Sequence, residues 1–251
     1  MTTAAVSRPG PEPIAAGAYD RVFYSGMAIS MAIVVFVGFA PTFYLRSLFG
    51  APPTITGATS LTPLAQFHGA LFTGWVLLFI IQTALVANHR VAVHRRLGIA
   101  GGVLAISMLV AGTMTAIKAA ARGSAPPGTD ALAFLIIPMG DMVLFAIFAG
   151  TALALRRNKE SHKRLMLLAY ISILVAGVAR LPGVIRLGPL GFFGLTFIFL
   201  VLAVVYDFWS RRRVHAAYIW GGALLVASVP LRLMLSGTQG WRSVAQFLVG
   251  S

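Results

Sequence analysis

The chain alternates seven long apolar stretches with short polar connections. A helix needs about 20 apolar residues to cross the hydrocarbon core of a bilayer, and each stretch is long enough. Because little sequence remains between them, the pattern predicts one all-α domain over 22–251, a polytopic bundle of seven transmembrane helices. The predicted spans are 22–45, 64–87, 97–119, 131–155, 163–184, 188–209 and 216–236.

Composition agrees with this pattern and narrows the chemistry. Hydrophobic residues make up 58% and charged residues 10% of the 251 residues, a mixture too apolar for a soluble domain of this length. The absence of cysteine excludes disulfides, thiolate metal sites and cysteine nucleophiles. Residues 1–21 lack the apolar run of a signal peptide, so we expect a flexible cytoplasmic tail.

The positive charge is concentrated in alternate connections. In a soluble protein the net charge of +14 would suggest nucleic acid as a partner. Here eleven of the twenty Lys and Arg residues lie in or beside three short connections, near residues 90–96, 156–164 and 211–213. Such loops stay in the cytoplasm, which predicts the N-terminus inside and the C-terminus outside a bacterial inner membrane. Anionic lipid headgroups are the partners expected at the cytoplasmic rim, and nucleic acid is not.

Two of these basic connections share a sequence pattern. "TALVANHRVAVHRRL" and "TALALRRNKESHKRL" both place a His eleven residues after the Thr and an Arg-Leu pair soon after that His. "YDFWSRRRVHAAYIWGG" repeats the basic run and the His more loosely. The pattern predicts three antiparallel hairpins, formed by the second and third, fourth and fifth, and sixth and seventh helices.

The hairpins place three histidines, the inner set, near the cytoplasmic interface. Three imidazoles can ligate zinc, and two facing imidazoles can hold a haem iron. The surrounding Lys and Arg disfavour a bare cation, so we expect no metal ion, but they suit the propionates of a haem b. Alternatively, these side chains only reach toward the lipid headgroups. The inner set is His94, His162 and His215.

Four further polar residues, the outer set, fall in the outer halves of predicted helices: His68, Asp141, Arg180 and Arg232. Ionisable side chains at this depth are costly and suggest function. We expect Asp141 to contact Arg180 or Arg232, which leaves one Arg for an anionic group. The set predicts a small polar pocket that opens outward and suits a carboxylate, a phosphate headgroup or a quinone-like carbonyl. Alternatively, Asp141 forms a structural pair and the other Arg reaches the interface.

Motifs of known chemistry are missing. The sequence contains no Gly-rich phosphate loop, G-x-S-x-G elbow or H-E-x-x-H pair. The last span has no Lys, which excludes a retinal Schiff base. No residue is therefore assigned a catalytic role.

The segments "HGALFTGWVLLFIIQTALV", "HRRLG", "PMGD", "HKRLMLLA", "ARLP", "YDF", "VHAAYIWGG" and "PLRL" resemble a family of uncharacterised bacterial multi-pass membrane proteins. The similarity runs from about Tyr19 onward and implies a fold but no activity. "HRRLG" also resembles the cytochrome b561-type membrane cytochromes, although "HKRLM" lacks their Gly. The expected function is small-molecule binding or interaction through the outward pocket. The alternatives are a b-type haem or quinone-linked redox protein, and a transporter or membrane enzyme of unrecognised kind.

Overall fold

The computed structural model describes residues 19–250, which form helices and connections with no strand. Seven helical segments are long and apolar enough to cross a membrane, which confirms the all-α architecture and agrees with the predicted number of candidate spans. The helices are α1 (Asp20–Phe39) with its π-helical continuation η1 (Ala40–Tyr44), α2 (Pro63–Ala87), α3 (Val91–Ala121), α4 (Ala131–Phe134), α5 (Ile136–Ala154), α6 (Lys159–Val178), the 3₁₀ turn η2 (Val184–Leu187), α7 (Gly188–Arg211), α8 (Ala216–Ser236) and α9 (Gln239–Val249).

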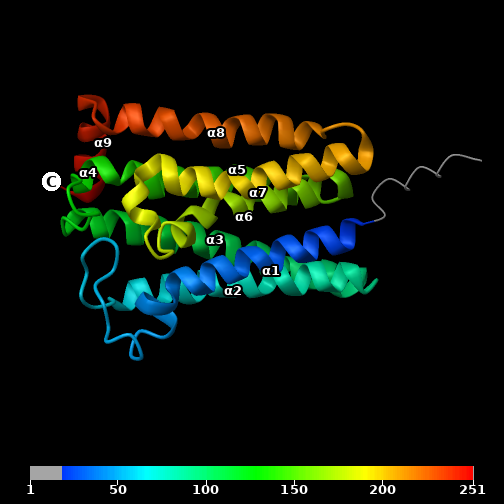
Figure 1. Ribbon diagram of the computed structural model, residues 1–251, viewed down its shortest axis with the longest axis horizontal. Helices are drawn as coiled ribbons and strands as arrows, with labels where there is room; N and C mark the ends of the chain where they lie inside the picture. The colour runs from blue at the N-terminus through cyan, green and yellow to red at the C-terminus, as the bar shows by residue number, and fades with distance from the viewer. Residues whose placement is uncertain (1–18, 251) are drawn as a thin grey trace, which may run out of the picture.

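The long helices run side by side along one axis, so the bundle has two distinct ends (Figure 1). We call one the basic end; it carries the start of α1 and the short connections 88–90, 155–158 and 212–215. The other, the loop end, carries the connections 45–62, 122–130 and 179–183 together with α9. Seven crossings place the two termini of the described chain at opposite ends.

Helix α6 is the central helix of the bundle. In its most apolar window 67% of the residues are buried, against 17–39% in the other six spans. It packs against α1, α5, α7 and α8. A helix covered by protein on most faces needs few lipid-facing apolar side chains, which explains why α6 has the lowest mean hydropathy of the seven, 1.3.

Several predicted boundaries are wrong; the third span was expected to begin at residue 97, but α3 begins at Val91. The fifth span was expected over 163–184, but α6 ends at Val178. Pro182 disfavours a helical conformation at the residue before it, and Gly183 turns the chain with φ +79°. The expected tail over 1–21 ends earlier as well, because α1 already begins at Asp20; residues 1–18 of that tail lie outside the described residues.

The amphipathic helix α9 was not predicted. It lies at the loop end against α3, α4 and α8, and Trp241 Nε1 donates to the carbonyl O of Leu132 at 2.8 Å. Its apolar residues recur at the i, i+3, i+4 spacing of a one-sided helix, and Thr238 caps its first turn. The signal was therefore present in the sequence, but a search for spans of membrane length passes over an eleven-residue helix.

The three predicted hairpins are not equivalent in their packing. The pairs α2–α3 and α5–α6 pack closely, whereas α7 and α8 each contact α6 more extensively than each other. At the loop end α1 and α6 approach closely through two glycines. A Cβ at Gly38 would overlap the carbonyl O of Gly177, so this contact requires the absence of a side chain.

Candidate functional site

Two members of the outer set form a buried ion pair, as predicted. Nη1 of Arg232 on α8 donates to Oδ1 of Asp141 on α5 at 2.6 Å. The same guanidinium donates to the carbonyl O atoms of Ile137 and Ser228, at 3.0 and 3.1 Å. Gly140 makes room for this side chain, because a Cβ there would overlap Cδ of Arg232. Arg232 is therefore the partner of Asp141.

This pairing leaves Arg180 as the remaining cation of the outer set. Nη1 of Arg180 donates to the carbonyl O of Ala176 at 2.6 Å, and the guanidinium lies 4.3 Å from the centre of the Phe39 ring. Among residues 19–250, no carboxylate oxygen lies within 4.0 Å of its nitrogens. Burial lowers the pKa of Arg180 to about 10, so the side chain is still charged at neutral pH.

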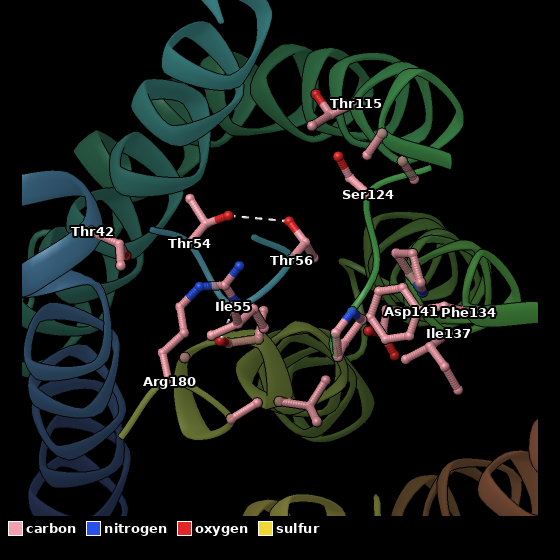
Figure 2. Close-up of a pocket in the computed structure, with 18 of the residues that line it drawn as sticks. Thr42, Thr54, Ile55, Thr56, Thr115, Ser124, Phe134, Ile137, Asp141 and Arg180 are labelled. Carbon is pink, nitrogen blue, oxygen red and sulfur yellow. Dashed lines mark hydrogen bonds between the residues drawn. The ribbon is translucent and has the colours of Figure 1, made fainter. Parts of the chain in front are cut away.

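Arg180 faces a partly open cavity of about 830 Å³ at the loop end. The cavity lies between the loop-end halves of α1, α2, α3, α5 and α6, and His68 and Asp141 also line it. Figure 2 shows the side chain of Arg180 extending toward Thr54 and Thr56, with Thr115 and Ser124 across the cavity. Three members of the outer set thus border one space, although Arg232 only supports it from behind Asp141.

The lining of the cavity is more apolar than predicted. The sequence suggested a small polar pocket, but aromatic and aliphatic side chains make most of the wall. The reason is that each helix contributes a strip of its predominantly apolar surface, and only a few polar positions fall within it. The large apolar side chains of the wall include Phe39, Phe43, Phe72, Val76, Met142, Ile173 and Phe192.

Three buried polar atoms in the cavity wall have no hydrogen-bond partner within the described chain. They are Nδ1 of His68, Oγ1 of Thr115 and the hydroxyl O of Tyr170. The Tyr170 side chain is buried, 1% exposed. A buried polar atom without a partner costs about 1–3 kcal/mol, so native proteins satisfy most of them. The wall of this mostly apolar cavity therefore holds polar groups that the described chain leaves without a partner.

Positive charge exceeds negative charge around the cavity. Arg122, Arg180 and Arg186 line it, together with Asp130 and Asp141. Asp141 is neutralised by its arginine partner. Asp130 caps α4 by accepting from the backbone N–H of Ala133 at 2.8 Å. The electrostatic field of the site therefore favours an anion.

The connection 45–62 covers part of the cavity and is held in place by one arginine. Arg46 donates to the carbonyl O atoms of Pro52 and Thr59, at 2.8 and 2.5 Å. Within the connection, the hydroxyls of Thr54 and Thr56 lie 3.1 Å apart and border the cavity. The sequence does not indicate this role of Arg46, because the carbonyls that it binds are not recognisable before the loop folds.

The structure brings two of the three inner histidines together. The rings of His94 and His162 lie 6.3 Å apart, centre to centre. Nδ1 of His162 donates to the carbonyl O of Ala152 at 2.8 Å, in the last turn of α5, and Nδ1 of His94 is buried without a partner. Neither ring lines the cavity at the loop end.

His215, the third member of the inner set, also lies at the basic end but has a different role. Its Nδ1 accepts from the backbone N–H of Ala217 at 3.1 Å and caps α8. Burial and the nearby Arg164 lower the pKa of His215, which keeps the ring neutral and able to accept. Within residues 19–250, no three His, Asp or Glu side chains form a group that could hold a metal ion.

An ion network at the basic end was not predicted. Arg164, which we counted among the cations of the cytoplasmic rim, is fully buried in α6 and pairs with Asp207 of α7. Arg164 also contacts Oε2 of Glu160 at 2.8 Å. The second oxygen of Asp207 accepts from the backbone N–H of His215 at 2.7 Å. The network therefore joins α6, α7 and the start of α8.

Asp20 extends the network to α1. Its carboxylate contacts Lys163 at 2.5 Å and Arg211 at 2.7 Å, and it accepts from the hydroxyl of Tyr206 at 2.8 Å. The sequence carried a signal for this network, since acidic residues are so few that each one near a span required a partner. We placed Asp20 in the tail and therefore missed it.

Comparisons of the chain with known protein families, with curated proteins and with solved structures find no match.

Proposed function

We propose that this protein is an integral membrane protein that binds a small amphiphilic molecule in the cavity at the loop end. The concentration of Lys and Arg at the basic end supports an orientation with that end in the cytoplasm. The cavity then opens on the outer side of a bacterial inner membrane, and the basic end faces anionic lipid headgroups.

One observation carries the proposal: an apolar cavity contains buried polar atoms that the described chain does not satisfy. Its volume of about 830 Å³ lies within the range of roughly 300–1,000 Å³ of small-molecule sites, which are mostly apolar with a few well-placed polar groups. Nδ1 of His68, Oγ1 of Thr115 and the charged Arg180 are such groups. A wholly apolar occupant would leave them unsatisfied, which is why we expect an amphiphile.

A substitution that fills the cavity tests this function. Thr115→Phe places a ring in the cavity and removes a hydroxyl that lacks a partner. The neighbouring Met114, 47% exposed, points away from the protein and provides the control Met114→Phe. We expect an organic extract of the purified protein to contain a bound small molecule that Thr115→Phe loses and Met114→Phe retains.

Thermal unfolding supplies an independent measurement. A ligand at a hundred times its Kd stabilises the folded state by about 2.7 kcal/mol. Adding the extracted molecule back should raise the Tm of the parent protein and of Met114→Phe, but not of Thr115→Phe. Equal extracts and equal Tm shifts in both variants would contradict binding in this cavity.

The proximity of His94 and His162 favours one second candidate, a b-type haem protein. His162 donates its Nδ1 hydrogen to a backbone carbonyl, the arrangement by which many metal-ligating histidines are oriented. The same bond also satisfies a free carbonyl at the end of α5, so it has a purely structural explanation. The absorption spectrum of the purified protein distinguishes the two explanations. A Soret band that is lost in His94→Ala and in His162→Ala supports a bound haem, and a parent protein without a Soret band contradicts it.

A further inference from the structure

We propose that the occupant of the loop-end cavity is a single-chain anionic amphiphile whose head group is bound by Arg180 and whose chain lies along α6 toward Tyr170. This inference rests on the proposed function and names its ligand class. The chemistry required is one anionic head, either a carboxylate or a phosphate, on an unbranched apolar chain.

The first argument is the charge of Arg180. Arg232 is paired with Asp141, whereas Arg180 has only a backbone carbonyl and the face of Phe39 as contacts within the described chain. A guanidinium has five N–H donors, and a single donor of Arg180 is used. The Arg180 side chain is only partly exposed to solvent, and a charge that has lost part of its hydration is costly unless it is paired. An anionic head group would provide that pair and accept two parallel hydrogen bonds, as carboxylates and phosphates do.

The second argument is the surroundings of that charge. The Arg180 side chain extends into the cavity toward Thr54 and Thr56 (Figure 2). One of these two hydroxyls donates to the other, which leaves one O–H free to donate to an oxyanion. Arg122 and Arg186 also line the cavity, and both add positive charge. The head-group region is thus positive and rich in donors.

The third argument is the shape of the apolar part. Tyr170 lies ~12 Å deeper along α6 than Val178, at 1.5 Å per residue. Between the two levels the wall carries Phe72, Val76 and Ile173. An apolar chain attached to a head group at Arg180 would lie against these side chains, and Tyr170 is the deepest α6 residue of the cavity wall.

The test is equilibrium binding of three compounds with the same chain to the protein in lipid nanodiscs, with empty nanodiscs as the blank. The compounds are decanoate, decyl phosphate and decanol. We expect at least one of the two anions to bind at least about tenfold more tightly than decanol, because hydrogen bonds to a charged partner are roughly twice as strong as neutral ones. The tighter anion identifies the head group as a fatty-acid carboxylate or a lipid phosphate.

Variants of Arg180 then assign the preference to one side chain. Arg180→Gln should abolish the preference for the anion and retain decanol binding, whereas Arg180→Lys should keep most of the preference. Tyr170→Phe removes a hydroxyl of the same cavity without changing its charge, so the ratio of anion to alcohol binding should stay unchanged. Circular dichroism and size-exclusion chromatography establish that each variant is folded.

The outcomes separate this inference from the proposed function. Equal binding of all three compounds, abolished by Thr115→Phe, would overturn the anionic head group and leave the binding function standing. A preference that persists in Arg180→Gln would overturn the assignment to Arg180. Failure of all three compounds to bind would overturn this inference, whereas the proposed function would fall only if the purified protein also yielded no bound molecule.

Discussion

Replacing Asp141 by Asn tests the buried ion pair that forms one wall of the cavity. Asn keeps the shape of the side chain and can accept a hydrogen bond from Arg232, so the substitution removes chiefly the negative charge. The guanidinium of Arg232 then remains buried, 6% exposed, with backbone and hydroxyl acceptors at Ile137 and Ser228. We expect the uncompensated charge of Arg232 to account for most of the loss in the free energy of unfolding.

The expected loss of stability depends on whether the contact between Asp141 and Arg232 behaves as a buried ion pair or as an ordinary hydrogen bond. Removing one partner of a buried ion pair costs about 3–5 kcal/mol, whereas an ordinary hydrogen bond between membrane helices averages ~0.6 kcal/mol. Because Arg232 keeps three other hydrogen bonds, we expect the lower end of the first range, about 3 kcal/mol. This is more than a hundredfold change in the folding equilibrium.

The assay is reversible unfolding in mixed detergent and SDS micelles, applied to Asp141→Asn, Arg232→Leu and the double variant. Each single variant leaves one buried group without its partner, and the double variant leaves neither. The double variant should therefore be more stable than the sum of the two losses predicts, by 1 kcal/mol or more. A loss of about 0.6 kcal/mol in Asp141→Asn, or strictly additive losses, would refute the reasoning.

Three further predictions concern other parts of the bundle. Arg164→Leu should cost about 3 kcal/mol in the same assay, because the buried carboxylate of Asp207 then keeps only Arg211, 3.5 Å away, and the backbone N–H of His215. Replacing both Arg164 and Asp207 by Leu should recover part of the loss, and additive losses would contradict the pairing. Gly140→Ala should destabilise by about 1–3 kcal/mol because its Cβ overlaps the paired arginine. The control is Gly150→Ala on the same helix, whose added Cβ meets no atom within 4 Å and should not destabilise the protein. Equal losses of stability in the two glycine variants would refute the packing argument. Single cysteines at Arg96 and Gly123 should react with an impermeant thiol reagent from opposite sides of the membrane, and reaction of both from one side would refute the proposed orientation.

The sequence by itself determined the all-α architecture and the number of spans. The length of an apolar run is a local property, and the cost of exposing backbone polar groups to lipid leaves a helix as the only solution for an isolated run. It also required a partner for Asp141, because a buried carboxylate is too costly to leave alone. The end of α6 near Val178 could also have been predicted from the sequence, because Pro182 and Gly183 follow it.

The tertiary structure decided which groups meet. Arg180 and Arg232 occupy similar depths and have the same charge, so only the order of the helices around α6 determined that Asp141 pairs with Arg232. The same holds for the histidines of the basic end. His94 and His162 come together because α3 and α6 both pack against α5, whereas His215 caps its own helix.

The cavity itself is wholly a tertiary feature. An apolar helix has no preferred face in its sequence, so nothing in the apolar runs indicates where neighbouring helices separate. The space lies beside the loop-end half of α6 and is covered in part by the connection 45–62. The hydrophobic effect places helices in the bilayer, but within lipid the packing of small residues such as Gly38 and Gly177 and a few buried ion pairs determine how they fit together, and these contacts join residues that are distant in sequence.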